Sequence, residues 1–166
     1  MPYPTYDDVL AAGAILPAYE RRTVPPDFED HNGHMNVAHY LTMASWGAQN
    51  ALHDWGVPVD WVEREKLGTF SAEHHLRYFH EVHVGAEVST RVRAVARSER
   101  GLLLHVLLLN DTERTIAYSM ELLTVHVDLS ARRTSAWPDD VAAGIDAAIA
   151  AHADVDWPLS GCLTVR

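Results

Sequence analysis

The residues with the clearest chemical potential lie in one short stretch, EDHNGHMNVAHY, at residues 29–40. It contains acidic side chains, three histidines, two asparagines and a glycine, and it comes directly before a segment with helical periodicity. Such a stretch could be a metal site, the polar start of a helix, or a catalytic loop. Its internal spacing and the surrounding elements have to decide between these interpretations.

A helix that begins just after this stretch would place free backbone amides next to a carboxylate. Asn36 is a plausible N-cap, because its side chain can accept a hydrogen bond from the first turn. The first-turn amides near Asn36 and Val37, together with the helix dipole, favour negative charge and could polarise a carbonyl oxygen. Gly33 would let the loop turn tightly without a Cβ in the way. The simpler alternative for Asp30 is an Asx turn that orders the loop.

Metal binding is suggested by two histidine pairs with a spacing of three, His31/His34 and His80/His83. However, the sequence contains no HExxH motif and no Cys/His set, and a structural zinc site usually needs four ligands. We therefore expect no metal.

The helix after Asn36 has an apolar stripe and a clear end. The stripe residues are Val37, Tyr40, Leu41, Ala44, Ala48, Ala51, Leu52 and Trp55. Gly56 followed by Pro58 predicts the stop. Because three stripe residues are alanines and Gly47 lies beside them, we expect a curved sheet to pack very close to the helix axis.

The rest of the chain predicts that sheet. Strands are expected at 19–24, 69–79, 87–97, 102–110 and 115–127, followed by a helix at about 138–152. In the second strand Phe70, Ala72, Leu76 and Tyr78 should share one face, and Ser71, Glu73, His75 and Arg77 the other. Short links between the last four strands favour an antiparallel meander. The prediction is a single α+β domain over 1–166, with a core at about 19–138 and a C-terminal helix and tail at 138–166.

Composition excludes several classes of function. The chain of 166 residues carries a net charge of −10, which disfavours a nucleic-acid partner. The acidic N-terminal segment is unlike a signal peptide, and no apolar run approaches the roughly 20 residues of a membrane span. The single cysteine, Cys162, allows no internal disulfide and fits a cytoplasmic protein.

The segment DHNGHMNVAHY resembles the D-x-N-G-H-[hydrophobic]-N-x-x-x-Y motif of the hotdog-fold acyl-CoA thioesterases, the 4-hydroxybenzoyl-CoA thioesterase-like group. GTFSAEHHLRYFHEVHVGAEV and YSMELLTVHVDLSARRTSAWP are similar to segments of the subgroup that acts on betainyl-CoA and dehydrocarnitinyl-CoA. The resemblance covers roughly 19–138. Val37 stands where a second Asn is common, and His31 fills a variable position. A long central helix wrapped by a curved antiparallel sheet is the fold it implies.

The resemblance also implies roles for individual residues. Asp30 matches the acid that serves as nucleophile or general base in thioester hydrolysis, and the family uses no metal or organic cofactor. In related enzymes basic residues at the subunit rim hold the phosphates of CoA. Arg132 and Arg133 could do so here, although a surface pair is more often only solvated.

Five further residues are candidates for substrate contact, and four of them also have a structural alternative. His34 could contact substrate or orient Asp30, or only form loop hydrogen bonds, and Tyr40 could be core or pocket wall. Glu73 and His75 could line the acyl pocket or form a solvated pair. A quaternary ammonium would need aromatic faces, and Trp46, which lies off the buried stripe, is a candidate to provide one.

Two other functions remain open at this point. One is a hotdog acyl-CoA dehydratase or hydratase that uses Glu73 and His75. The other is a non-catalytic acyl-CoA-binding protein. For assembly, we expect a homodimer or a dimer of dimers with sheets joined edge to edge, because the strand after Gly85 and the face carrying Glu73, His75 and Arg77 would otherwise be poorly covered.

Overall fold

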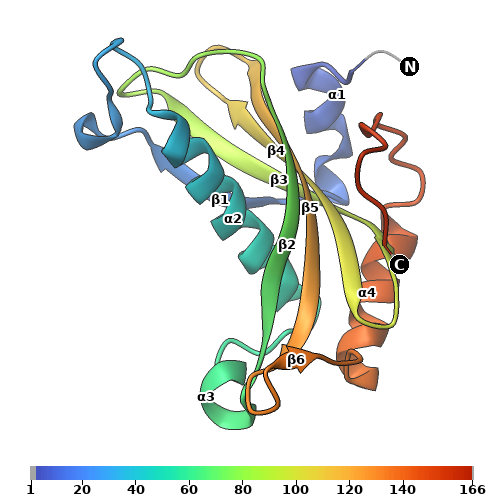
Figure 1. Ribbon diagram of the computed structural model, residues 1–166. Coiled ribbons are helices and arrows are strands. Elements are labelled where there is room, and N and C mark those ends of the chain that lie inside the picture. Colours follow the sequence, from blue (N-terminus) through green and yellow to red (C-terminus); the bar gives the residue numbers. More distant parts are fainter. Residues whose placement is uncertain (1–2, 166) are drawn as a thin grey trace.

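A long helix, α2, lies against the inner face of a curved antiparallel sheet (Figure 1). The computed structural model describes residues 3–165. Its helices are α1 (Tyr6–Ala11), α2 (Val37–Asp54), α3 (Trp61–Glu65) and α4 (Asp139–Ala151), with short 3-10 turns η1 (Ala12–Ala14) and η2 (Pro26–Phe28). Its strands are β1 (Ala18–Thr23), β2 (Leu67–Tyr78), β3 (Glu87–Arg97), β4 (Gly101–Asn110), β5 (Thr115–Asp128) and β6 (Arg133–Thr134). The predicted α+β fold, with a sheet wrapped around one helix, is confirmed.

The N-terminus of α2 is capped as the sequence predicts. Asn36 Oδ1 accepts a hydrogen bond from the N–H of Ala38 at 2.9 Å, which satisfies one free first-turn donor. At the other end, Gly56 adopts a φ of 103° that favours glycine, and the helix stops there. Val37 was expected in the buried stripe, but it is 56% exposed and lines a hollow beside the Asp30 loop.

Close approach between α2 and the sheet depends on Gly47. A Cβ at this position would lie 2.9 Å from Cβ of Thr90 on β3, closer than real side chains come. The hydroxyl of the same threonine accepts a hydrogen bond from the N–H of Glu20 on β1, at 3.1 Å. Thr90 of β3 therefore contacts both helix α2 and the edge strand β1.

The strand order is β1-β3-β4-β5-β2, and β6 pairs with β5. The expected meander is correct for β3, β4 and β5 but wrong for β2, which pairs with β5 and not with β3. The segment 79–86 is not a turn. It leaves β2 with the N–H of Phe79 bonded to the C=O of Ala117, and it ends with the C=O of Ala86 accepting from Val24 N–H. The link therefore crosses the sheet from the edge strand β2 to β3, which lies next to the opposite edge strand β1.

The alternation expected along β2 is interrupted by a bulge. The pairing register with β5 shifts between Ser71 and Glu73, so Ala72 is the extra residue. Phe70 pairs with Val125, whereas Leu76 pairs with Met120. Because paired residues share a face and the face alternates at each residue, Phe70 lies on the opposite face from Leu76 and Tyr78. The expected common face of Phe70, Ala72, Leu76 and Tyr78 was therefore wrong for Phe70. Ser71 was expected on the face of Glu73, but it pairs with Thr124 and lies on the opposite face.

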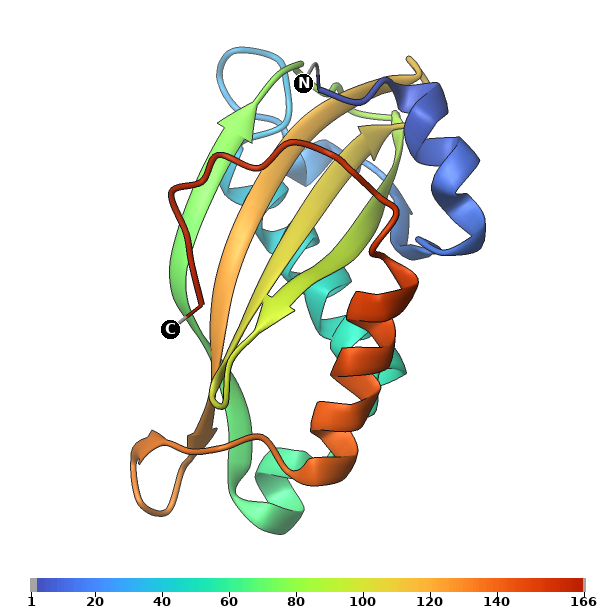
Figure 2. The same ribbon diagram turned by 90° about the vertical axis from the view of Figure 1, so that its right-hand side faces the viewer.

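The outer face of the sheet is covered by both ends of the chain (Figure 2). Tyr6 and Val9 of α1 pack with Leu107 and Leu109 of β4. This explains why every residue of β4 is buried, as its apolar sequence predicts. The C-terminal tail crosses the same face, where the carboxylate of Glu121 accepts hydrogen bonds from the backbone N–H and the hydroxyl of Ser160.

The longer of the two edge strands is β2, with twelve residues against six in β1. The expectation that the strand after Gly85 forms an edge was wrong, because β3 lies between β1 and β4. β2 carries the exposed side chains of Phe70 and Tyr78, and its outer face exposes Glu73 and Arg77. Across residues 3–165, no helix has the length and apolar character needed to cross a membrane.

The contact between Gly47 and Thr90 can be tested by Gly47→Ala. The new methyl group must displace Thr90, so we expect a loss of about 1–3 kcal/mol in the free energy of unfolding. Gly13→Ala is the matched control, because a Cβ there meets nothing within 4 Å. Urea denaturation should place Gly13→Ala within about 0.5 kcal/mol of the parent protein. Equal stability of both variants would contradict the close packing.

Candidate active site

The loop that carries Asp30 is a tight, self-bonded turn. The N–H of Asp30 donates to the C=O of His34, and the N–H of Gly33 donates back to the C=O of Asp30, both at 3.0 Å. Gly33 has a φ of 84°, a conformation that other residues rarely adopt. The loop closes where the N–H of Asn36 donates to the C=O of Phe28. Asp30 is thereby fixed one short turn away from the start of α2.

The Asp30 carboxylate has one oxygen engaged and one available. Oδ1 accepts a hydrogen bond from the N–H of Asn32 at 2.8 Å, which is the Asx turn considered as the structural alternative. Within residues 3–165 no hydrogen bond to Oδ2 is found. The side chain is 15% exposed. The turn and a chemical role are therefore compatible, because the turn uses a single oxygen.

A hollow of about 490 Å³ opens beside this carboxylate. Its lining residues are Asp30, Asn32, His34, Met35, Val37, Tyr40, Tyr78, Phe79, His80 and Glu81. Four of the predicted site residues, Asp30, His34, Val37 and Tyr40, thus meet in one place. Val37 is the first residue of α2, so its N–H has no carbonyl one turn earlier in the helix to bond. Asn36 and Gly33 do not line the hollow but set the backbone conformation of the loop.

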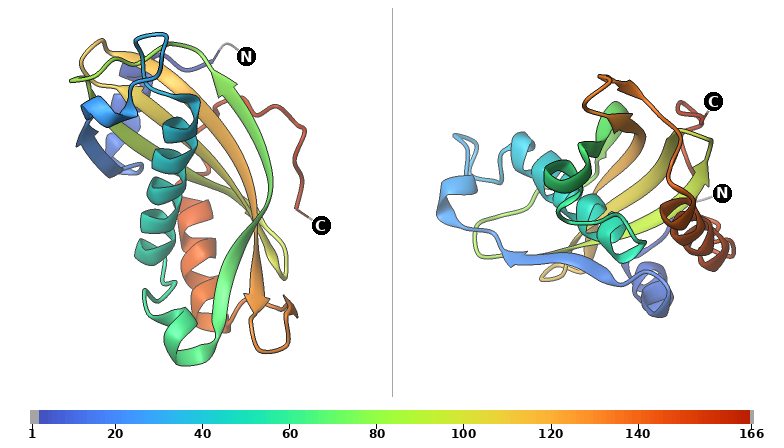
Figure 3. Two further views of the ribbon diagram at one scale, coloured as in Figure 1. Left: turned by 60° about the vertical axis from the view of Figure 1, so that its left-hand side comes forward. Right: turned by 90° about the horizontal axis from the view of Figure 1, so that it is seen from below.

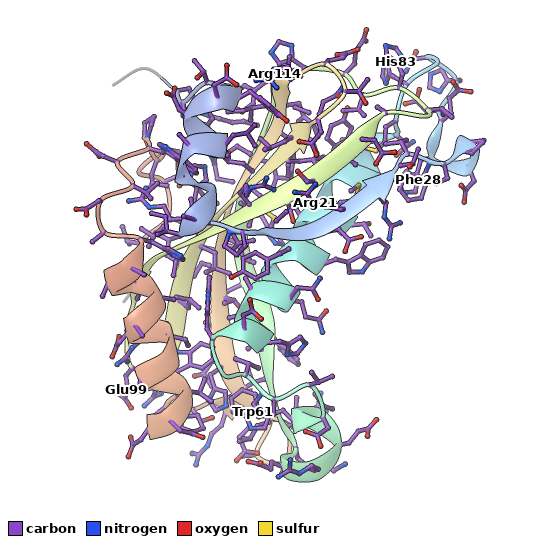
Figure 4. All side chains as sticks on the ribbon, turned by 180° about the vertical axis from the view of Figure 1, so that it is seen from behind. Arg21, Phe28, Trp61, His83, Glu99 and Arg114 are labelled. Carbon is purple, nitrogen blue, oxygen red and sulfur yellow. The ribbon has the colours of Figure 1, made fainter. Side chains whose placement is uncertain are left out.

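The crossing link supplies the opposite wall of the hollow. It is tied to the Asp30 loop because Met35 N–H donates to the C=O of Val82 at 2.7 Å. A ring nitrogen of His83, Nδ1, lies 3.1 Å from the C=O of Gly33. Figure 4 shows His83 and Phe28 at the same end of the molecule, far from Trp61. Sequence reasoning did not assign Tyr78, Phe79 or Glu81 to the site, although the segment RYFHEVHVG that contains them was part of the family resemblance.

Charged and titratable groups alternate around the rim. His34 Nδ1 lies 3.9 Å from Asp30 Oδ1, and His34 Nε2 lies 4.0 Å from Glu81 Oε2. Glu81 Oε1 is 3.5 Å from His83 Nε2. The imidazole of His34 therefore stands between two carboxylates. A protonated His34 would be attracted to both, which gives this side chain a way to orient Asp30.

Tyr40 belongs both to the hydrophobic core and to the wall of the hollow beside Asp30. Its side chain is 4% exposed and its hydroxyl donates to the C=O of His80 at 3.4 Å. Burial raises the pKa of Tyr40 to about 12, so the phenol is neutral at physiological pH. The Tyr40 ring meets the ring of Tyr78 edge to face, with a centroid distance of 5.4 Å.

The other predicted site residues lie elsewhere. Glu73 and His75 sit on the outer face of β2, where His75 Nδ1 is 3.8 Å from a carboxylate oxygen of Glu121. Trp46 is partly exposed on α2, and the guanidinium of Arg22 lies over its ring, 4.5 Å from the centroid. None of these three lines the hollow in a single chain.

Arg132 and Arg133 lie at the far end of the sheet from Asp30. They follow β5 and line a second hollow together with Phe70 and Val125. Figure 3 shows this end, near α3 and β6, separated from the N-terminus of α2 by the length of the helix. Among residues 3–165, no group of three or more His, Cys, Asp or Glu side chains is arranged to hold a metal ion.

A family model described as the thioesterase-like superfamily matches residues 24–145. The chain therefore belongs to this superfamily. A betainyl-CoA thioesterase from Pseudomonas aeruginosa is 30% identical over 139 residues, which cover 83% of this chain and 86% of that protein. An L-carnitine dehydrogenase/betainyl-CoA thioesterase from Agrobacterium fabrum is 30% identical over 117 residues, which cover 70% of this chain but 24% of that longer protein.

Solved structures agree with this assignment. A Staphylococcus aureus protein in complex with CoA has a TM-score of 0.81 at 21% identity, covering 91% of this chain and 96% of that one. A 1,4-dihydroxy-2-naphthoyl-CoA thioesterase from Synechocystis has a TM-score of 0.68 at 14% identity, covering 84% of this chain and 97% of that one. The expected hotdog fold is confirmed, and so is the expected class of enzyme, a thioesterase.

Proposed function

We propose that this protein hydrolyses an acyl-CoA thioester in the hollow beside Asp30. The observation that carries the proposal is the position of the Asp30 carboxylate, which is mostly buried and has one oxygen available beside the first turn of α2. A carboxylate and an amide donor facing one space are the two groups that acyl transfer needs.

The chemistry follows from these two groups. The thioester oxygen would accept a hydrogen bond from the N–H of Val37, which is worth a few kcal/mol as charge develops on that oxygen. In one route Asp30 removes a proton from a water molecule as the water attacks, the C–S bond breaks, and the CoA thiolate takes up a proton. In the other route Asp30 attacks directly, the thiolate leaves, and water hydrolyses the resulting anhydride. Both routes end in free acid and CoA.

The resemblance implies that neither route needs a metal or an organic cofactor, and we propose the same here. Hydration of an acyl-CoA is the weaker proposal, because the Glu73 and His75 pair it would use lies on the outer face of β2, outside the hollow. The exposed thiol of Cys162 fits a reducing compartment, and we propose a cytoplasmic location.

We further propose a symmetric homodimer, or a dimer of dimers, formed through β2. This edge is long, unpaired and carries exposed aromatic side chains, features that proteins usually cover. A two-fold axis makes two copies of β2 antiparallel. The end of one subunit that carries Arg132 and Arg133 would then lie beside the Asp30 hollow of the other. That arrangement would give the CoA phosphates a cationic site close to the reacting thioester.

The acyl group that we propose is of the betainyl or dehydrocarnitinyl type. The relative from Pseudomonas aeruginosa, which matches most of the chain, is a betainyl-CoA thioesterase. A cationic acyl group also suits a protein with a net charge of −10.

Asp30→Asn should lower kcat by at least ~10²-fold with a nearly unchanged KM, because the amide can neither attack nor accept the proton. Free-thiol release measures the rate. Asn36→Ala is the companion variant: it removes the cap of α2 and should cost about 1 kcal/mol of stability, with a smaller loss of activity. A folded Asp30→Asn protein that keeps most of its turnover would refute the catalytic role.

The role of the two arginines can be separated from folding by changing the substrate. Arg132→Ala combined with Arg133→Ala should raise KM for an acyl-CoA about tenfold or more, since charge-assisted hydrogen bonds to phosphate are lost. The same variant should treat the matching N-acetylcysteamine thioester, which lacks phosphates, like the parent protein. Equal losses on both substrates would rule out phosphate binding.

Sedimentation equilibrium tests the dimer. At micromolar concentration the protein should sediment as a dimer or tetramer, because edge pairing of β2 satisfies backbone groups that are otherwise open. His74→Pro removes an N–H that points away from β5, because the N–H of Phe79 bonds to Ala117 and the direction alternates along β2. It should shift the population toward monomer with loss of activity. A monomeric and fully active parent protein is the result that would exclude the β2 dimer.

A further inference from the structure

The wall of the hollow beside Asp30 combines aromatic and acidic side chains. Three of its lining side chains are aromatic, Tyr40, Tyr78 and Phe79, and two are carboxylates, Asp30 and Glu81. Within the described part of the chain, no lysine or arginine lines it. A wall of aromatic faces and negative charge, without a cation of its own, is complementary to a positively charged group.

The aromatic rings are held in fixed positions. The planes of Tyr40 and Tyr78 meet at 78°, so the two rings form a corner. Behind them lies Tyr118, which is fully buried, with its centroid 5.0 Å from that of Tyr78 and 5.8 Å from that of Tyr40. Tyr3 packs against Phe79 at 4.8 Å. Little ordering entropy remains to be lost when a ligand binds such a corner.

The rings also remain neutral. Burial raises the pKa of Tyr78, and it raises that of Tyr40 to about 12. A neutral phenol ring attracts a cation to an accessible face. Tyr78, which is 47% exposed, has such a face, whereas Tyr40 is only 4% exposed and packs against it. The negative charge at the rim comes instead from Glu81, which is largely exposed and lies close to His34 and His83. Attraction for a cation therefore combines a packed aromatic corner with an exposed carboxylate.

A quaternary ammonium is the cation that suits this wall best. It has no N–H to donate, so it cannot form a conventional hydrogen bond to a carbonyl and depends mainly on aromatic faces and diffuse negative charge. In a betainyl group the nitrogen is only two bonds from the thioester carbonyl. Its binding site must therefore adjoin the catalytic carboxylate, as the Tyr40–Tyr78 corner adjoins Asp30. The exposed Trp46 does not meet this condition, and its ring already contacts Arg22.

We propose that Tyr78, with Tyr40 and Glu81, forms the subsite that binds the trimethylammonium end of the acyl group and makes the enzyme specific for cationic acyl-CoA. This inference rests on the proposed function. It assigns specificity to residues of β2 and the crossing link, next to the carboxylate that does the chemistry.

The test compares betainyl-CoA with its uncharged isostere 3,3-dimethylbutyryl-CoA, in which carbon replaces the nitrogen. The parent protein should show a higher kcat/KM for the cation. Tyr78→Leu should reduce the ratio of the two kcat/KM values by roughly 2- to 30-fold, the range expected for one cation–π contact, mainly through the cationic substrate. Tyr78→Phe is the matched control, because it keeps the ring face, and it should preserve the ratio.

Glu81→Gln provides a second variant at an exposed position that does not depend on packing. It should also lower the ratio, and the effect should shrink as salt concentration rises. Equal kcat/KM for both esters in the parent protein, or equal losses on both esters in Tyr78→Leu, would overturn the subsite while leaving the thioesterase intact. Failure to release thiol from either ester would instead overturn the proposed function.

Discussion

The site depends on the backbone hydrogen bond between Met35 and Val82. It joins two segments that are far apart in sequence, the loop that leads into α2 and the link that leaves β2. The bond from Asn36 to Phe28 and the contact from His83 to Gly33 hold the same junction from either side. Without this junction Asp30 would be a surface turn residue, and Tyr78 would end an open edge strand.

The junction also explains how one short loop can serve both structure and chemistry. Asp30 uses Oδ1 to hold its own turn and leaves Oδ2 available. Asn36 uses its side chain to cap α2, and the N–H of Val37 remains without a helical partner. Because the backbone is fixed by these contacts, the carboxylate and the amide are positioned before a substrate arrives. In the hydrolysis that we propose, preorganisation of this kind would supply the electrostatic stabilisation of the transition state.

Local features were predicted correctly because short-range physics determines them. The cap at Asn36, the stop at Gly56 and the buried strand β4 each follow from a few neighbouring residues. The partner of β2 was missed, because the length of the link 79–86 does not reveal whether it turns back or crosses the sheet. The face of Phe70 was missed because the bulge at Ala72 leaves no clear signal in the sequence.

The residues of the candidate site also divide into those that local sequence determines and those that long-range strand pairing determines. Asp30, His34, Val37 and Tyr40 are close in sequence, and a single motif located them. Tyr78, Phe79 and Glu81 reach the hollow only through the unexpected crossing, so spacing could not have placed them. Trp46 was favoured by its exposure on the helix, but Arg22 of the neighbouring strand β1 packs on its ring. Long-range pairing decided each of these outcomes.

The most direct measurement is the time course of free-thiol release with betainyl-CoA in large excess over the purified protein. Hydrolysis in the Asp30 hollow predicts a linear release of CoA over many turnovers, with betaine formed in equal amount. Release that stops at or below one thiol per protein chain, or binding of the ester without any free thiol, would contradict it and would indicate a protein that only binds acyl-CoA.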